Sequence, residues 1–251
     1  MISIIKIEFS QGICPSMKSV PAICKKLPAS YLRSLIIEHL KPMDPELWDD
    51  CAVSNTMPFQ CDELYVEKPA LITEGLQDLT LADHKFHRIM KYLRLSDLRS
   101  FFDGGYDFAL NAKISFGHYQ KVEEKEYFVF TEGSGIYFCL KTARNLSPKN
   151  QDALCQLMES EVQRVFFVNA VKVSIAEGYQ EYFFHEEYGP ALSLTDLDTR
   201  SLSPQHLEQI LEGASFQVAY ASDGLGVIIL AGAWFPHTIL LPSEIVCIEA
   251  K

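Results

Sequence analysis

The chain has 251 residues, of which 48% are hydrophobic and 22% charged, and its formal net charge is −11. This composition is typical of a globular protein with a buried core and excludes a disordered or fibrous chain. The negative charge disfavours nucleic acid and anionic membranes as partners, because both attract Lys and Arg. It favours a basic protein or a cationic ligand, although moderate acidity can serve solubility alone.

Seven cysteines are spread over the chain at long spacings. An odd number at these spacings does not form a disulfide framework, so we predict a reducing compartment and a cytoplasmic protein. Lys6 and Glu8 interrupt the apolar start, which therefore does not read as a secretory signal. The longest apolar stretch, residues 225–235, is too short to span a bilayer.

The first elements follow from periodicity and capping residues. Residues 5–9 alternate apolar and charged side chains, which predicts a strand. Residues 29–41 carry apolar side chains at helical spacing, and Asp44-Pro45 predicts the start of a short helix through Trp48. Residues 54–78 show no clear period and are predicted to be a linker or a long, partly ordered loop.

The central region changes from helical to strand periodicity. Residues 79–93 predict an amphipathic helix, and a shorter helix is expected after Ser96. The alternation over residues 106–117 predicts one long strand, or two strands joined by a bulge. Residues 126–131 and 136–141 are predicted to pair as a hairpin through the intervening glycine-rich turn.

The C-terminal part alternates helices and strands. Ser147-Pro148 predicts a helix to about residue 165, and Ser203-Pro204 predicts another that ends at Gly213. Strands are expected at residues 166–175, 179–184, 215–221, 225–230 and 238–248.

These elements predict an α+β fold with a mixed, mainly antiparallel sheet and helices packed on one side. We expect an N-terminal helical and irregular lobe at 1–78 and an α+β domain at 79–251. The domain contains three candidate helix–hairpin units, starting near residues 96, 147 and 203. The alternative is that their Ser-Pro and Ser-Asp pairs are ordinary helix caps.

Metal and cofactor signals are weak. Asp83 and His87 share one face of the predicted helix, beside His84, but the sequence supplies no third ligand. Cys14 and Cys24, like Cys51 and Cys61, are too far apart for a zinc knuckle, so a zinc site would require ligands that converge only in the fold. No glycine-rich loop joins a strand to a helix. We therefore predict neither a metal nor a cofactor.

No catalytic signature is present either. The seven histidines do not form a local pair with a cysteine, and the serine elbow, zinc-protease and phosphate-loop motifs are absent. Glu161 lies close to the apolar stripe of its helix. It is either a part-buried acid or base with a raised pKa, or a marginal glutamate with its carboxylate in water.

The segment YQEYFFHEEY at residues 179–188 has the most unusual composition. Aromatic rings supply contact area and carboxylates supply steering, so the segment predicts a surface for a basic protein. The alternative is an edge strand with rings on the core and charges in water. The predicted protein-binding residues are Tyr179, Glu181, Tyr182, Glu186, Glu187 and Tyr188.

The function predicted from these features is a non-catalytic protein that binds a basic partner, by neutralising a toxin or acting as a chaperone. The alternative is a hydrolase or transferase in which a histidine meets a cysteine or carboxylate only in the fold. A regulatory domain that holds a small molecule between helices and sheet stays open as a third possibility. The sequence does not define the oligomeric state.

Overall fold

The computed structural model describes residues 1–13, 20–49, 51–67, 85, 89–97, 100, 106–107, 114–177, 191–198, 215–222 and 225–231. The chain divides into two compact units, residues 1–65 with 115–180, and residues 66–114 with 181–251. The lobe boundary predicted after residue 78 and the helix–hairpin start predicted near residue 203 lie outside the described residues.

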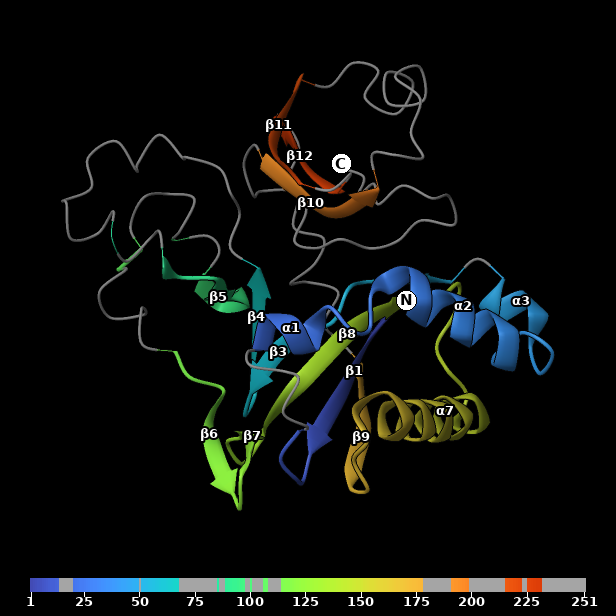
Figure 1. Ribbon diagram of the computed structural model, residues 1–251. Coiled ribbons are helices and arrows are strands. Elements are labelled where there is room, and N and C mark those ends of the chain that lie inside the picture. The colour runs from blue at the N-terminus through green and yellow to red at the C-terminus, as the bar shows by residue number, and fades with distance from the viewer. Residues whose placement is uncertain are drawn as a thin grey trace. The chain divides into compact units, whose positions relative to one another are not determined.

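An antiparallel sheet forms the centre of the first unit, with strand order β4-β3-β8-β1-β9 and β2 paired with β8 (Figure 1). β1 lies between β8 and β9, so that Ile5 is opposite both Phe138 and Ile175. The predicted N-terminal strand is confirmed. The strands are β1 (Ile2–Phe9), β2 (Ala52–Val53), β3 (Met57–Gln60), β4 (Glu63–Glu67), β8 (Ser134–Lys141) and β9 (Val171–Glu177).

The described residues of this unit form four helices: α1 (Val20–Cys24), α2 (Ala29–Leu40), α3 (Pro45–Trp48) and α7 (Pro148–Phe166). The predictions for α2, α3 and α7 are confirmed. Taken along the chain, β1, α2, β3, β8, α7 and β9 follow a β-α-β-β-α-β order. With the strand order β3-β8-β1-β9, this is a ferredoxin-like arrangement.

The helices pack on one side of this sheet, as the sequence predicts (Figure 1). Phe9 at the end of β1 contacts Phe166 at the end of α7, with ring centroids 5.3 Å apart. Thr56, just before β3, donates its hydroxyl to the carbonyl oxygens of Cys24, the last residue of α1, and of Leu27, three residues beyond it. Ile4, Ile5 and Ile7 are 0% exposed, and the one polar residue at the start of the strand, Ser3, is also buried, so side chains on both faces of the strand are buried there.

The hairpin predicted between residues 126–131 and 136–141 is wrong. β7 (Lys125–Phe130) pairs instead with β6 (Gly117–Val122), and β8 pairs with β1 and β3. Both edges of β8 are therefore occupied. Glu123 and Glu124 form the turn between β6 and β7. Because neither is glycine or asparagine, the sequence does not indicate a hairpin turn there.

Residues 54–67 contain β3 and β4 and are not the predicted loop. The two strands are short and are joined by only two residues, Cys61 and Asp62, so neither is long enough to show a period. The strand predicted at 166–175 begins later than expected. α7 continues to Phe166, Phe167 adopts the left-handed conformation, and β9 begins at Val171.

In the second unit, Lys85 and Ile89 are helical, but β5 (Tyr92–Arg94) replaces the last turn of the helix predicted at 79–93. The buried Leu93 between half-buried neighbours fits a strand. A 3₁₀ turn, Leu95–Asp97, follows. The described ends of the strand predicted at 106–117, residues 106–107 and 114–116, are not in a strand.

A three-stranded antiparallel sheet, in the order β10-β12-β11, also belongs to the second unit. Its strands are β10 (Ala191–Asp198), β11 (Ser215–Ser222) and β12 (Leu225–Ala231). The pairing of β11 with β12 confirms the predicted strands 215–221 and 225–230. Within the described segments, no helix has the length and apolar character that crossing a bilayer requires.

Gly135 allows the close approach of β8 to β1. A Cβ atom at this position would overlap the carbonyl oxygen of Ile7 and lie 3.0 Å from the Phe59 ring. We expect Gly135→Ala to lower the free energy of unfolding by at least about 2 kcal/mol, because overpacking shifts a central strand. Urea denaturation measures this loss.

Ser134→Ala is the matched control. The Ser134 hydroxyl is buried and has no hydrogen-bond partner in the described part of the chain. Its removal is therefore expected to leave stability unchanged or slightly increased. Equal destabilisation by both substitutions would contradict the packing argument.

Candidate functional site

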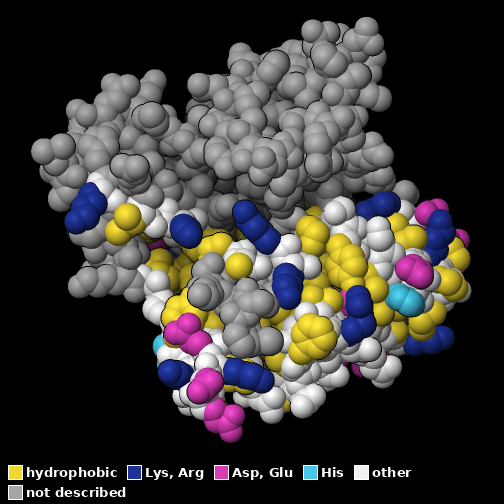
Figure 2. All heavy atoms as spheres, in the orientation of Figure 1, with side chains coloured by type: hydrophobic (Ala, Val, Ile, Leu, Met, Phe, Trp, Pro, Cys, Tyr) yellow, Lys and Arg dark blue, Asp and Glu magenta, His cyan; other side chains and the backbone are white. Residues whose placement is uncertain are grey.

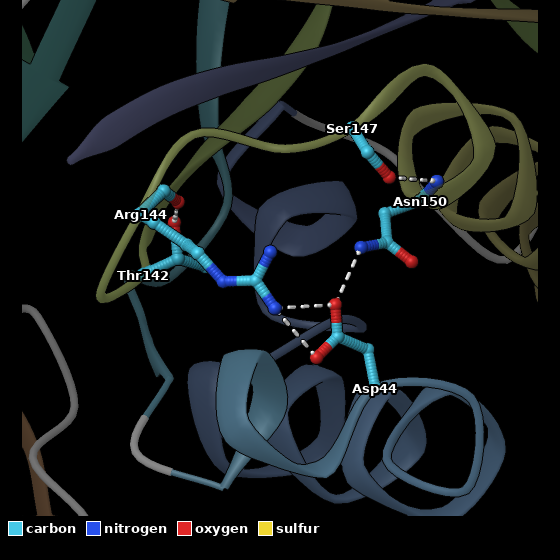
Figure 3. A network of polar contacts seen from close by, with 5 residues as sticks. All are labelled: Asp44, Thr142, Arg144, Ser147 and Asn150. Carbon is cyan, nitrogen blue, oxygen red and sulfur yellow. Dashed lines mark hydrogen bonds and ion pairs between the residues drawn. The ribbon is translucent and has the colours of Figure 1, made fainter.

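A polar network joins the start of α7 to the start of α3 (Figure 3). Arg144 Nη2 lies 2.9 Å from Asp44 Oδ1 and 3.0 Å from Oδ2, and Asn150 Nδ2 donates to Oδ2 at 3.0 Å. Asp44 occupies the predicted N-cap position of α3, but its side chain makes no capping hydrogen bond. Its carboxylate instead joins the β8–α7 connection to α3.

The predicted cap of α7 is confirmed in the same network. Ser147 Oγ accepts a hydrogen bond from the backbone amide of Asn150, and Pro148 occupies the first turn. This arrangement satisfies an amide that would otherwise lack a partner at the helix start. The network is structural, because each group in it holds a chain segment in place.

A second cluster joins α2 to α7. Glu161 is only 8% exposed, accepts two hydrogen bonds from Arg164, at 2.9 and 2.5 Å, and accepts one from the Tyr31 hydroxyl. The hydrogen bonds and the negative charge of Glu161 raise the pKa of Arg164. Of the two sequence interpretations of Glu161, the structure supports burial, with the carboxylate paired to a cation.

An aromatic row runs from the β6–β7 hairpin to the end of α7. Tyr119 contacts Phe128, Phe128 contacts Phe130, Phe130 stacks on Phe9, and Phe9 meets Phe166. The centroid separations are 5.2–5.4 Å, the range in which stacked and edge-to-face rings attract one another. The row fixes the end of α7 against the sheet and the hairpin.

At the end of this row, Phe167 is 82% exposed and has φ 55°, a left-handed conformation that bulky residues rarely adopt. The Lys26 ammonium lies 5.9 Å from the adjacent Phe166 ring, Lys25 is also exposed, and Arg164 precedes Phe167 by one helical turn. We call Phe167, Arg164, Lys25 and Lys26 the helix-end surface. Figure 2 shows dark blue side chains over α1 and beside the end of α7, with the larger magenta groups toward the margins of this face.

The helix-end surface is not apparent from the sequence. The apolar run Phe166-Phe167-Val168 predicts the beginning of a strand, and there is no glycine after Phe166 to indicate that α7 ends there. The available signal was a pair of lysines after α1, but only the fold brings them next to α7.

The buried Cys139 and the half-buried Cys155 are poor candidates for nucleophiles. Burial raises the pKa of the Cys139 thiol to about 12, partly offset by a hydrogen bond to Ser54. Burial, followed by the negative charges of Glu159 and Asp152, raises the pKa of Cys155. Since the thiolate is the reactive form, both shifts disfavour attack by these cysteines.

The residues predicted to bind a basic protein, Tyr179, Glu181, Tyr182, Glu186, Glu187 and Tyr188, lie outside the described residues. Asp83, His84 and His87 lie outside them as well. Both sets of residues therefore stay predictions. Within the described ranges, no group of three His, Cys, Asp or Glu side chains is placed to hold a metal ion.

No protein-family model and no curated protein matches this chain. Among solved structures, it is similar to a chain of a Csm1–Csm4 cassette in complex with pppApApA, at a TM-score of 0.55 and 15% identity. It is also similar to a chain of the Csm1–Csm4 cassette in complex with cA4, at a TM-score of 0.50 and 14% identity. Both matches cover 96% of this chain and 99% of the other, so the similarity in fold extends over nearly the whole sequence.

We expect Asp44→Ala to lower the free energy of unfolding by about 1–2 kcal/mol, because Arg144 and Asn150 lose a shared charged acceptor. The matched control is Asp49→Ala, which breaks a more exposed ion pair with Lys41 at the other end of α3. Its expected cost is below about 0.5 kcal/mol. Thermal and urea unfolding of the two variants measure the difference, and equal costs would contradict the importance of the network.

The raised pKa of Cys139 predicts a loss of stability at high pH. The folded state keeps this thiol protonated, whereas the unfolded chain releases the proton near pH 9.0. The contribution is therefore complete below pH 9.0 and is lost as the pH rises toward about 12. The slope contributed by one proton is at most about 1.4 kcal/mol per pH unit.

Urea unfolding over this pH range should give a shallower decline for Cys139→Ala than for the unmodified chain. Tyr137 remains in both proteins, and its pKa is also raised by burial, so a residual decline is expected. Cys61→Ala is the control, because Cys61 is exposed. A decline that Cys139→Ala leaves unchanged would contradict the burial argument.

Proposed function

We propose that this chain is a non-catalytic, protein-binding subunit of a multi-protein complex, with a role like that of the matched chain in the Csm1–Csm4 cassette. The observation that carries the proposal is the similarity to that chain over nearly the full length of both. At 15% identity this similarity concerns the fold, and the role is our extension from it.

The chemistry of the described side chains supports binding more than catalysis. Asp44 and Glu161, the carboxylates in the two polar clusters, hold helices together through Arg144 and Arg164. The Cys139 thiol has a pKa of about 12, far from the range of a nucleophile. The two carboxylates therefore serve the packing of α2, α3 and α7.

The finer proposal is that the partner presents a basic face and binds at Tyr179, Glu181, Tyr182, Glu186, Glu187 and Tyr188 in the cytoplasm. The net charge of −11 and the clustered rings and carboxylates of this segment support it. A chaperone for one basic client, or a protein that neutralises a basic toxin, is the corresponding function outside such a complex.

Co-expression with the proteins encoded beside its gene tests the proposal. We expect a stoichiometric complex with a Csm1-like protein, measured by affinity purification and light scattering. Replacing Glu181, Glu186 and Glu187 by lysine should weaken the complex by about tenfold or more, because the steering charges are reversed. The matched control reverses Glu123, Glu124 and Glu126, three exposed glutamates of the β6–β7 hairpin.

The two experiments test the subunit role and the binding segment separately. Elution of the chain alone from every co-expression would overturn the subunit role. A stable complex that tolerates the triple substitution at Glu181, Glu186 and Glu187 would keep the role and remove the proposed segment.

A further inference from the structure

We propose that the helix-end surface binds an acidic segment of a partner protein, with an apolar side chain of that segment packed against Phe167. This surface is separate in sequence from residues 179–188, and its partner has the opposite charge. The inference does not depend on the complex proposed above.

Phe167 ends α7 in a left-handed conformation that closes the helix, but its bulky side chain is unusual at such a position. A left-handed residue at the end of a helix is usually glycine or asparagine, and a side chain there costs about 1–2 kcal/mol. Phe167 nevertheless places an aromatic ring at 82% exposure in this position. Exposed rings with buried supports are typical anchors of protein interfaces.

The backbone on both sides of Phe167 is held by packing and hydrogen bonds. Phe166 is 1% exposed and contacts Phe9, and the Val168 amide donates to the carbonyl of Gln163 to close the helix end. The Ser10 amide donates to the carbonyl of Ala170, which fixes the chain just beyond Phe167. A partner therefore meets a preformed surface and orders little backbone on binding.

The cations of the helix-end surface, of which Lys26 lies over the neighbouring Phe166 ring, determine the chemistry of the partner. Lys25 and Lys26 are exposed, and neither forms an ion pair with another residue that the structure describes. Arg164 is 69% exposed; its Nε and Nη2 donate to Glu161 and Tyr31, which leaves Nη1 for a second carboxylate. Two free ammonium groups and one shared guanidinium match two or three carboxylates.

An acidic protein segment fits this surface better than RNA does. A polyanion gains affinity from many phosphate contacts and would approach a chain of net charge −11. Within this unfavourable field, the helix-end surface offers two lysines that have no ion-pair partner among the described residues. A segment with two or three carboxylates around one apolar residue carries less charge and also uses the Phe167 ring.

The test measures binding of a fluorescein-labelled Gly-Ser peptide, in which Glu and Asp flank a single Leu, to the full chain. The reference probes are the same peptide with Gln and Asn in place of Glu and Asp, and single-stranded oligouridylate. Phe167→Asn removes the ring and keeps a residue that tolerates the left-handed conformation, so the fold is retained. The combined substitution Lys25→Gln and Lys26→Gln removes the free cations.

The combined control Lys121→Gln and Lys125→Gln removes two exposed lysines from the β6–β7 hairpin. We expect saturable, salt-sensitive binding of the acidic peptide, weakened about tenfold by each helix-end variant and unchanged by the control. Absence of saturable binding, or equal weakening by the control, overturns the inference. Tighter binding of oligouridylate than of the peptide, lost in the helix-end variants, would assign the surface to RNA instead.

Discussion

The stacking of Phe9 on Phe130 joins the three parts of the first unit. Phe9 ends the central strand β1, Phe130 ends the β6–β7 hairpin, and Phe166 at the end of α7 meets the Phe9 ring edge to face. Each ring pair contributes about 0.5–1.5 kcal/mol beyond the burial of its area. Because one residue serves sheet, hairpin and helix, a shift of any one of them disturbs the other two.

This constraint explains why the end of α7 is a defined surface. The helix is held at its start by Ser147 and the Asp44 network, near its end by Glu161 and Tyr31, and at its last residue by Phe9. The position of Phe167 is therefore set by contacts distributed over nineteen residues of helix. Polar and aromatic contacts of this kind fix the position of the helix, and so also the position of the exposed residue that follows it.

The sequence predicts elements where a local physical signal is complete. The alternation in β1 has a buried odd-numbered face, and Ser147-Pro148 supplies both a side-chain acceptor and a favoured first residue for α7. The pairing of strands cannot be predicted in the same way, because an alternating pattern indicates a strand but not the strand that it pairs with. β7 and β8 are separated by a glycine-containing turn, yet Gly135 allows β8 to pack closely against β1, and β7 pairs with β6.

The candidate sites, like the strand pairing, depend on contacts between distant residues that the sequence does not indicate. The burial of Glu161 depends on Tyr31 from another helix and Arg164 on its own, so the helical pattern alone left two interpretations open. The helix-end surface required a left-handed Phe167, which resembles the start of a strand in sequence, and lysines that precede it by some 140 residues. A net charge of −11 describes the average field of the chain but not this local reversal of sign. A local reversal of charge favours recognition of one partner over another, because the lysines attract an acidic segment here while the net negative charge repels it from the rest of the molecule.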